Sequence, residues 1–194
     1  MIVGETVVCQ SNACYSYLGR KLDLWGNTDM EIIHCEELLC EAMDLRNNVV
    51  GFCYGRAGNP ADKEETVAFL ASNQKGIIAK LELFLSRQSD FKPETPFFVS
   101  SHATAPDFHI FELLSQLNLL AECRGLPLVT DDIALPSLHS FYANFQKLPA
   151  NAKYFSSIMA NAPCNNLMAV FGSMPHGQRW EKGMRLPEDT SGVY

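Results

Sequence analysis

The stretch Val7-Val8-Cys9-Gln10-Ser11-Asn12-Ala13 decides the fold of this chain, because a short apolar strand runs directly into a polar turn and a helix. We predict a strand at residues 6–9 and a helix at 11–21, with Ser11 as the N-cap. Free N–H groups and the helix dipole at such a start form an anion site. Gln10 adds an amide that can bind an amino-acid head group, so this turn is a candidate binding site.

The composition is that of a globular protein with a proper core, since 47% of the 194 residues are hydrophobic. The length suits one domain, or one domain with appendages. The net charge of −7 and the absence of a basic stripe argue against nucleic acid or an anionic membrane as a partner. The longest apolar runs, such as Leu117 to Leu120, fall far short of the ~20 residues of a membrane span. The N-terminus does not have the pattern of a secretory signal.

The cysteines indicate a reducing, intracellular compartment, of which the cytoplasm is the expected one. There are seven, an odd number, and no Cys-x-x-Cys pair occurs among them. We interpret them as free thiols, most of them small core side chains. No cysteine and histidine spacing supports zinc, so no metal site is predicted.

Two long helices are predicted in the first half of the chain. The box Thr28-Asp29-Met30-Glu31 opens the first, which continues to about Tyr54. A second begins after Pro60-Ala61-Asp62 and continues to about Arg87, before the prolines at 93 and 96. Helices of this length must bury one apolar stripe against their neighbours.

The box Thr104-Ala105-Pro106-Asp107 is the strongest local signal in the second half, because it has a capping threonine, a first-turn proline and a closing aspartate. It opens a helix with an apolar face from Phe108 to Leu120. A short helix from Leu135 to Leu148 and a last turn or two at 151–159 are expected next. From Pro163 the regular pattern fades into a tail.

The Gln-Ser-Asn-Ala turn before a Tyr-Leu-Gly-Arg-Lys helix (residues 10–13 and 17–21) resembles the cytosolic glutathione transferases, and the mu class in particular. In that family this turn holds the γ-glutamyl end of glutathione, which implies that role for Gln10 and Ser11. The Thr104 and Asp107 box resembles the folding box of the family's C-terminal domain. The resemblance covers most of the chain.

Three further positions take roles from the resemblance. Asp44, in Met43-Asp44-Leu45-Arg46, matches an aspartate that reaches across the family's dimer to the amine of glutathione in the other subunit. Tyr54 matches a tyrosine that faces the electrophile pocket and donates a hydrogen bond there. Phe171 matches an aromatic residue in the C-terminal segment that covers the pocket.

The resemblance implies a mainly α fold: the helical bundle of a glutathione-transferase C-terminal domain, preceded by a short strand–helix remnant of a thioredoxin-like domain. The expected division is 1–25 for the remnant, 26–162 for the all-helical domain and 163–194 for an extended tail.

The departures from the family concern catalysis and the dimer. Family members activate the glutathione thiol with a tyrosine, serine or cysteine near their N-terminus, and in the family this residue lies upstream of the turn that Gln10 matches. We therefore expect a glutathione-transferase-like chain that is catalytically incomplete as it stands, with glutathione as substrate or ligand and no cofactor. Ser16 stands where mu-class dimers tend to place an arginine at the twofold axis, which weakens the expectation of the usual homodimer.

Alternatives stay open at this stage. The chain is either a piece of a conjugating transferase or a non-catalytic scaffold subunit of a larger protein assembly, which would use the helical domain and the tail. A third option is a binder that stores hydrophobic molecules. For single residues, Gln10 and Ser11 could form a purely structural turn, Asp44 could be a solvated carboxylate, and Tyr54 could be a half-buried core residue.

Overall fold

The computed structural model describes residues 1–157, 160, 164–165 and 169. Helices dominate this part of the chain, so the predicted mainly α fold is confirmed. The elements are β1 (Ile2–Val3), β2 (Thr6–Val7), α1 (Ser11–Lys21), α2 (Asp29–Cys53), α3 (Lys63–Asn73), η1 (Gln74–Ile78), α4 (Ala79–Ser86), α5 (Ala105–Cys123), η2 (Val129–Asp131), α6 (Pro136–Phe145), η3 (Pro149–Asn151) and α7 (Ala152–Phe155).

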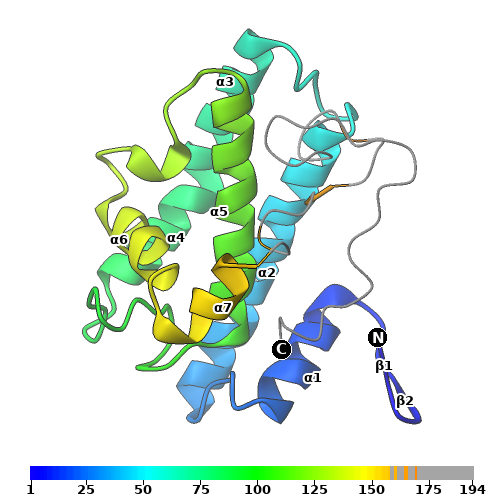
Figure 1. Ribbon diagram of the computed structural model, residues 1–194, viewed down its shortest axis with the longest axis vertical. Helices are drawn as coiled ribbons and strands as arrows, with labels where there is room; N and C mark the ends of the chain where they lie inside the picture. The colour runs from blue at the N-terminus through cyan, green and yellow to red at the C-terminus, as the bar shows by residue number, and fades with distance from the viewer. Residues whose placement is uncertain (158–159, 161–163, 166–168, 170–194) are drawn as a thin grey trace.

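The long helices α2 and α5 lie side by side at the centre of the bundle and form its most extensive helix–helix contact (Figure 1). Each buries a stripe at helical spacing: Leu38, Leu45 and Phe52 on α2, and Leu114 and Leu117 on α5 are at most 2% exposed. Burying one such side chain contributes about 1.5–3 kcal/mol. Helix α1 packs against both α2 and α5, and α4 packs against α6.

The predicted strand at 6–9 is shorter than expected and belongs to a hairpin. Thr6–Val7 pairs antiparallel with Ile2–Val3, and Ile2 lies opposite Val7. Gly4 has φ 59° in the connecting turn, a conformation that glycine adopts without a steric penalty. The Ile2 and Val7 side chains are 75% and 65% exposed.

Helix α1 has the predicted bounds, but the expectation that Ser11 caps it is wrong. Gln10 is the N-cap residue, with φ 71° and ψ 137°, and no side chain makes a capping hydrogen bond. The first helical hydrogen bond runs from the Cys14 N–H to the Gln10 carbonyl at 3.0 Å. Ser11 is therefore the first helical residue, one position past the place from which a side chain accepts the N–H groups of the first turn.

Helix α2 begins at the predicted box. The Glu31 N–H donates to Thr28 Oγ1 at 3.2 Å, and the Thr28 N–H donates to a Glu31 carboxylate oxygen at 3.0 Å. The helix ends at Cys53 with Tyr54 as the C-cap, followed by Gly55 at φ 67°. A left-handed glycine here is the usual way to end a helix.

The helix predicted from Asp62 to Arg87 ends close to those residues but is not continuous. Asp62 caps α3 by accepting the Glu65 N–H at 2.9 Å. At Gly76, with φ −97° and ψ −107°, the backbone leaves helical geometry inside the π-helical segment η1, and α4 resumes at Ala79. Gly76 lacks a β-carbon, so it adopts these non-helical angles at little steric cost.

The second half follows the predicted order. Helix α5 begins after Thr104, with Pro106 in its first turn, and α6 and α7 follow. One expectation for the apolar face is wrong: Phe108 is 39% exposed, and its ring lies edge-on to Phe145 at 5.2 Å. Most of the predicted tail, including Phe171, lies outside the described residues.

Candidate functional site

The predicted binding turn is exposed to solvent, and a hydrogen bond to α2 holds it in place. Gln10 and Ser11 are both exposed at the N-terminus of α1. The next residue, Asn12, donates from Nδ2 to the Leu39 carbonyl of α2 at 3.2 Å. Cys14 Sγ lies 3.6 Å from the Val8 carbonyl oxygen on the other side of the turn. The N–H groups at the start of α1 are thus presented to solvent on a fixed support, which suits a carboxylate ligand.

Asp44 and Tyr54 lie on the same helix but at different levels. Asp44 is exposed on α2, and Tyr54 is half-buried against the core at its C-terminal end. Ten residues separate them, which is about 15 Å of helix at 1.5 Å per residue. The two side chains therefore cannot contact the same small chemical group within one chain. The resemblance likewise assigns them to different groups: Asp44 to the amine of glutathione in the other subunit, and Tyr54 to the electrophile.

A polar cluster between α1, α2 and α5 escaped the sequence analysis. The Tyr15 ring stacks on the His109 ring with centroids 4.6 Å apart and 20° between the planes. His109 is 4% exposed, and its Nδ1 has no hydrogen-bond partner in the described part of the chain. Burial, and then the positive charge of Arg46, lower the pKa of His109 to about 4. The imidazole is therefore neutral at neutral pH.

The same cluster perturbs Tyr15. Burial and the negative charge of Glu112 raise the pKa of the Tyr15 phenol, while Arg46 opposes them. Tyr15 and His109 thus form a neutral aromatic contact that joins α1, which carries the predicted binding turn, to α5. A histidine among the buried apolar positions of α5 is the sequence signal that could have indicated this contact.

The box at the start of α5 is a buried network around one carboxylate. Asp107 is fully buried, and its Oδ2 accepts the Thr104 N–H at 2.6 Å and the Thr104 hydroxyl at 2.7 Å. Its Oδ1 accepts the Phe98 N–H at 2.8 Å, which fixes the preceding loop. Burial raises the pKa of Asp107 to about 6, although these hydrogen bonds and the charge of His102 oppose the rise.

This pKa predicts a fall in stability as the pH rises through mildly acidic values. The folded chain binds the Asp107 proton up to about pH 6, whereas an unfolded aspartate releases it near about pH 4. The folded state therefore holds more protons between these values, and the free energy of unfolding falls by on the order of 3 kcal/mol from about pH 4 to about pH 6. Above that range the effect is constant.

Urea unfolding of the wild type and Asp107→Asn across this range isolates the effect, because all other carboxyl groups are common to both proteins. We expect the free energy of unfolding of the wild type to fall relative to that of Asp107→Asn as the pH rises from about 4 to about 6. A difference that stays constant from pH 4 to pH 7 would contradict the raised pKa.

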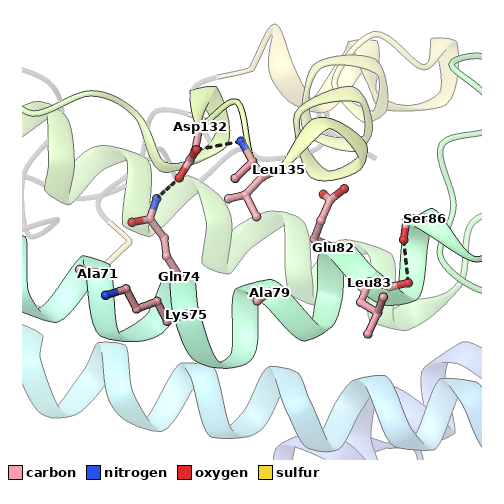
Figure 2. Close-up of a pocket in the computed structure, with 10 residues that line it drawn as sticks. Ala71, Gln74, Lys75, Ala79, Glu82, Leu83, Ser86, Asp132 and Leu135 are labelled. Carbon is pink, nitrogen blue, oxygen red and sulfur yellow. Dashed lines mark hydrogen bonds between the residues drawn. The ribbon is translucent and has the colours of Figure 1, made fainter.

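A groove of about 490 Å³ lies apart from the predicted site residues (Figure 2). Its walls are the α3–η1–α4 helix and residues 132–135, and several of its polar side chains already have partners. Gln74 Nε2 donates to Asp132 at 3.2 Å, and the Glu82 carboxylate accepts the N–H groups of Ser137 and Leu138 at 3.0 and 2.8 Å. None of Gln10, Ser11, Asp44 or Tyr54 lines it, so this groove is not the predicted binding site.

No group of three or more histidine, cysteine, aspartate or glutamate side chains among the described residues could hold a metal ion. Within the same residues, no helix combines the length and apolar character that crossing a membrane requires.

Comparisons with known proteins agree with this architecture. The family model described as the C-terminal domain of glutathione S-transferase matches residues 43–158. Glutathione S-transferase Mu 2 of Rattus norvegicus is 31% identical over 157 residues, which are 81% of this chain and 63% of the rat protein. Glutathione S-transferase Mu 3 of Homo sapiens is 27% identical over 176 residues, 90% of this chain and 70% of the human protein.

A solved structure supports the fold. The glutathione S-transferase Blo t 8 aligns with a TM-score of 0.71 and 16% identity, over 91% of this chain and 74% of that one. The chain spans slightly less than two thirds of the first curated relatives that it matches. The family model, which matches more than half of the residues, shows that this chain belongs to the glutathione S-transferase family.

Proposed function

We propose that this chain binds glutathione at the turn before α1 and supplies the helical part of a glutathione transferase. The observation that carries the proposal is the exposure of Gln10 and Ser11 at a helix N-terminus that Asn12 ties to α2. The glutathione γ-glutamyl group carries a carboxylate and an ammonium. The free N–H groups suit the carboxylate, and the Gln10 side-chain oxygen suits the ammonium.

The proposal extends to the electrophile side and to a second subunit. Tyr54 would donate a hydrogen bond to the electrophile, since its ring lies against the core and its hydroxyl is a donor. Asp44 would accept the glutathione amine bound to a second copy, which its exposure permits. A homodimer in a reducing intracellular compartment fits both roles.

We also propose that residues 1–194 alone bind glutathione without activating it. A thiol becomes nucleophilic near neutral pH when a donor beside the sulfur stabilises the thiolate. The positions that match site residues of the family are the turn at Gln10 and Ser11, Asp44, Tyr54 and Phe171, and none of them has that role in the family. The scaffold-subunit alternative differs in one respect, because it requires no glutathione binding at all.

Calorimetric titration of glutathione tests the proposal. We expect a dissociation constant between micromolar and millimolar for the wild type. Gln10→Ala should weaken binding at least tenfold, because a hydrogen bond to a charged group contributes about 1.5–3 kcal/mol. Gln146→Ala, at the C-cap of α6, is the matched control and should bind as the wild type does.

Two further measurements on the same proteins separate the parts of the proposal. Asp44→Asn should weaken binding only at protein concentrations at which light scattering shows a dimer. The wild type should not accelerate conjugation of glutathione to an aryl halide above the buffer rate. No binding at several millimolar glutathione would overturn the proposal and favour the scaffold subunit.

A further inference from the structure

A serine and a histidine lie in hydrogen-bond contact in the loop before α5, away from the binding turn. Ser100 Oγ is 3.0 Å from Nδ1 of His102, and both residues are half-buried. A hydroxyl beside an imidazole nitrogen is the arrangement by which proteins activate a serine nucleophile, provided that a third group orients the ring. The structure contains such a group.

The carbonyl oxygen of Trp25 orients the imidazole. It lies 3.2 Å from His102 Nε2. A carbonyl only accepts hydrogen bonds, so Nε2 must carry the proton in this contact. In the neutral ring Nδ1 is then the unprotonated acceptor, so in any hydrogen bond between the two side chains the Ser100 hydroxyl is the donor. This is the direction of proton transfer that a general base requires.

The surroundings favour the charges that such a transfer creates. The His102 backbone N–H donates to Ser100 Oγ at 3.3 Å, which stabilises negative charge on that oxygen. Asp107 interacts electrostatically with His102, and a carboxylate there stabilises an imidazolium. The Ser100 hydroxyl also lies 3.0 Å from the His102 carbonyl, so its proton has two acceptors and stays within this turn.

The loop is held at both ends, which keeps the pair in place. On one side the Phe98 N–H donates to Asp107 at 2.8 Å, and on the other the Ala105 N–H donates to the Leu24 carbonyl at 2.8 Å. Positioned groups of this kind lower the entropic cost of reaching the reactive geometry.

We propose that Ser100 is a nucleophilic serine, activated by His102, that accepts acyl groups from activated aryl esters. Ser100 Oγ attacks the ester carbonyl carbon while its proton passes to His102 Nδ1. The bond from that carbon to the aryl oxygen then breaks, and the phenol leaves with the proton. Water attacks the acyl-serine next and gives a proton to the same nitrogen. As the bond from the acyl carbon to Ser100 Oγ breaks, His102 Nδ1 returns that proton to Ser100 Oγ, and a carboxylic acid leaves. The reaction uses no glutathione, so it is independent of the proposed function.

Ser101 provides a matched control within the same loop. It is exposed, and it makes no hydrogen bond among the described residues. Simple exposure would make Ser101 the more reactive of the two serines. Activation by His102 would make Ser100 the more reactive one.

Labelling and turnover of the 194-residue chain in glutathione-free buffer test the proposal. A fluorophosphonate probe should modify Ser100, with loss of fluoride, and peptide fragmentation should place the label there and not on Ser101. Hydrolysis of p-nitrophenyl acetate should fall at least tenfold in Ser100→Ala and in His102→Gln. Ser101→Ala should keep the wild-type rate within twofold, as should His139→Gln, which changes a histidine on α6.

Locating the fluorophosphonate label on the wild type tests the proposal even if a variant fails to fold. Absence of label, equal label on both serines, or an unchanged hydrolysis rate in a folded Ser100→Ala protein would overturn it. If the turn is purely structural, the variants will have a lower thermal midpoint, and the wild type will not be labelled at Ser100.

Discussion

Asp107→Ala is expected to lower the free energy of unfolding by about 3 kcal/mol at pH 7, one of the two largest effects we expect. The substitution leaves the Phe98 N–H, the Thr104 N–H and the Thr104 hydroxyl inside the protein without their acceptor. Each buried donor without a partner costs about 1–3 kcal/mol. Removing a carboxylate that burial disfavours offsets part of this sum.

Urea denaturation followed by circular dichroism measures the loss. Asp131→Ala is the matched control, because Asp131 is exposed and its contact with His139 is 3.6 Å long. Such a surface pair contributes about 0–1 kcal/mol. Asp107→Asn keeps one acceptor and should fall between the alanine variant and the wild type. Equal midpoints for Asp107→Ala and Asp131→Ala would show that the network does not stabilise the fold.

Gly26→Ala is expected to destabilise the protein by about 2–4 kcal/mol through a steric clash. A β-carbon at Gly26 would overlap the backbone carbonyl carbon of Glu31 and would lie 2.6 Å from the Ile32 nitrogen. Backbone atoms in the first turn of α2 cannot move aside without disturbing the Thr28 and Glu31 box. The start of the central helix would therefore shift.

Gly51→Ala is a control that should change the stability in the opposite direction. Gly51 lies inside α2, and its added β-carbon would meet only the Ala57 methyl group at 3.5 Å, an ordinary contact. Alanine is favoured over glycine in a helix by about 0.5–1 kcal/mol. Thermal unfolding should thus show a lower midpoint for Gly26→Ala and a raised one for Gly51→Ala. Two changes of the same sign would contradict the packing at Gly26.

The elements that the sequence predicted well are those set by local contacts. Both capping boxes, Thr28 with Glu31 and Thr104 with Asp107, join residues three apart, so their spacing alone carries the information. The helix bounds follow from these boxes and from the glycines and prolines between them. The position of the N-cap was predicted wrongly, because serine is a favoured N-cap residue and Ser11 stands next to Gln10. Gln10 is the N-cap because of its backbone angles, which the sequence does not show.

The features that the sequence did not predict depend on distant partners. The break at Gly76 accompanies a hydrogen bond from Gln74 to Asp132, 58 positions along the chain. The Tyr15 and His109 stack joins two helices that are far apart in the sequence. For the candidate site, Gln10, Ser11, Asp44 and Tyr54 came from the family resemblance. The exposure of Gln10, Ser11 and Asp44 is compatible with the roles, Tyr54 is half-buried, and binding by all four stays a prediction.

Helices α2 and α5 pack together in the folded protein, but the ribosome completes them at different times. Helix α2 ends at Cys53, but its main packing partner is not complete until Cys123. At about 5–20 residues per second, the ribosome takes roughly 4–14 seconds to add that partner. During this interval the apolar stripe of α2 has no α5 to cover it, and an isolated helix is only marginally stable in water. The nascent chain therefore passes through a stage at which its longest helix is prone to aggregation, and the yield of folded protein should depend on translation speed and on chaperones that shield α2.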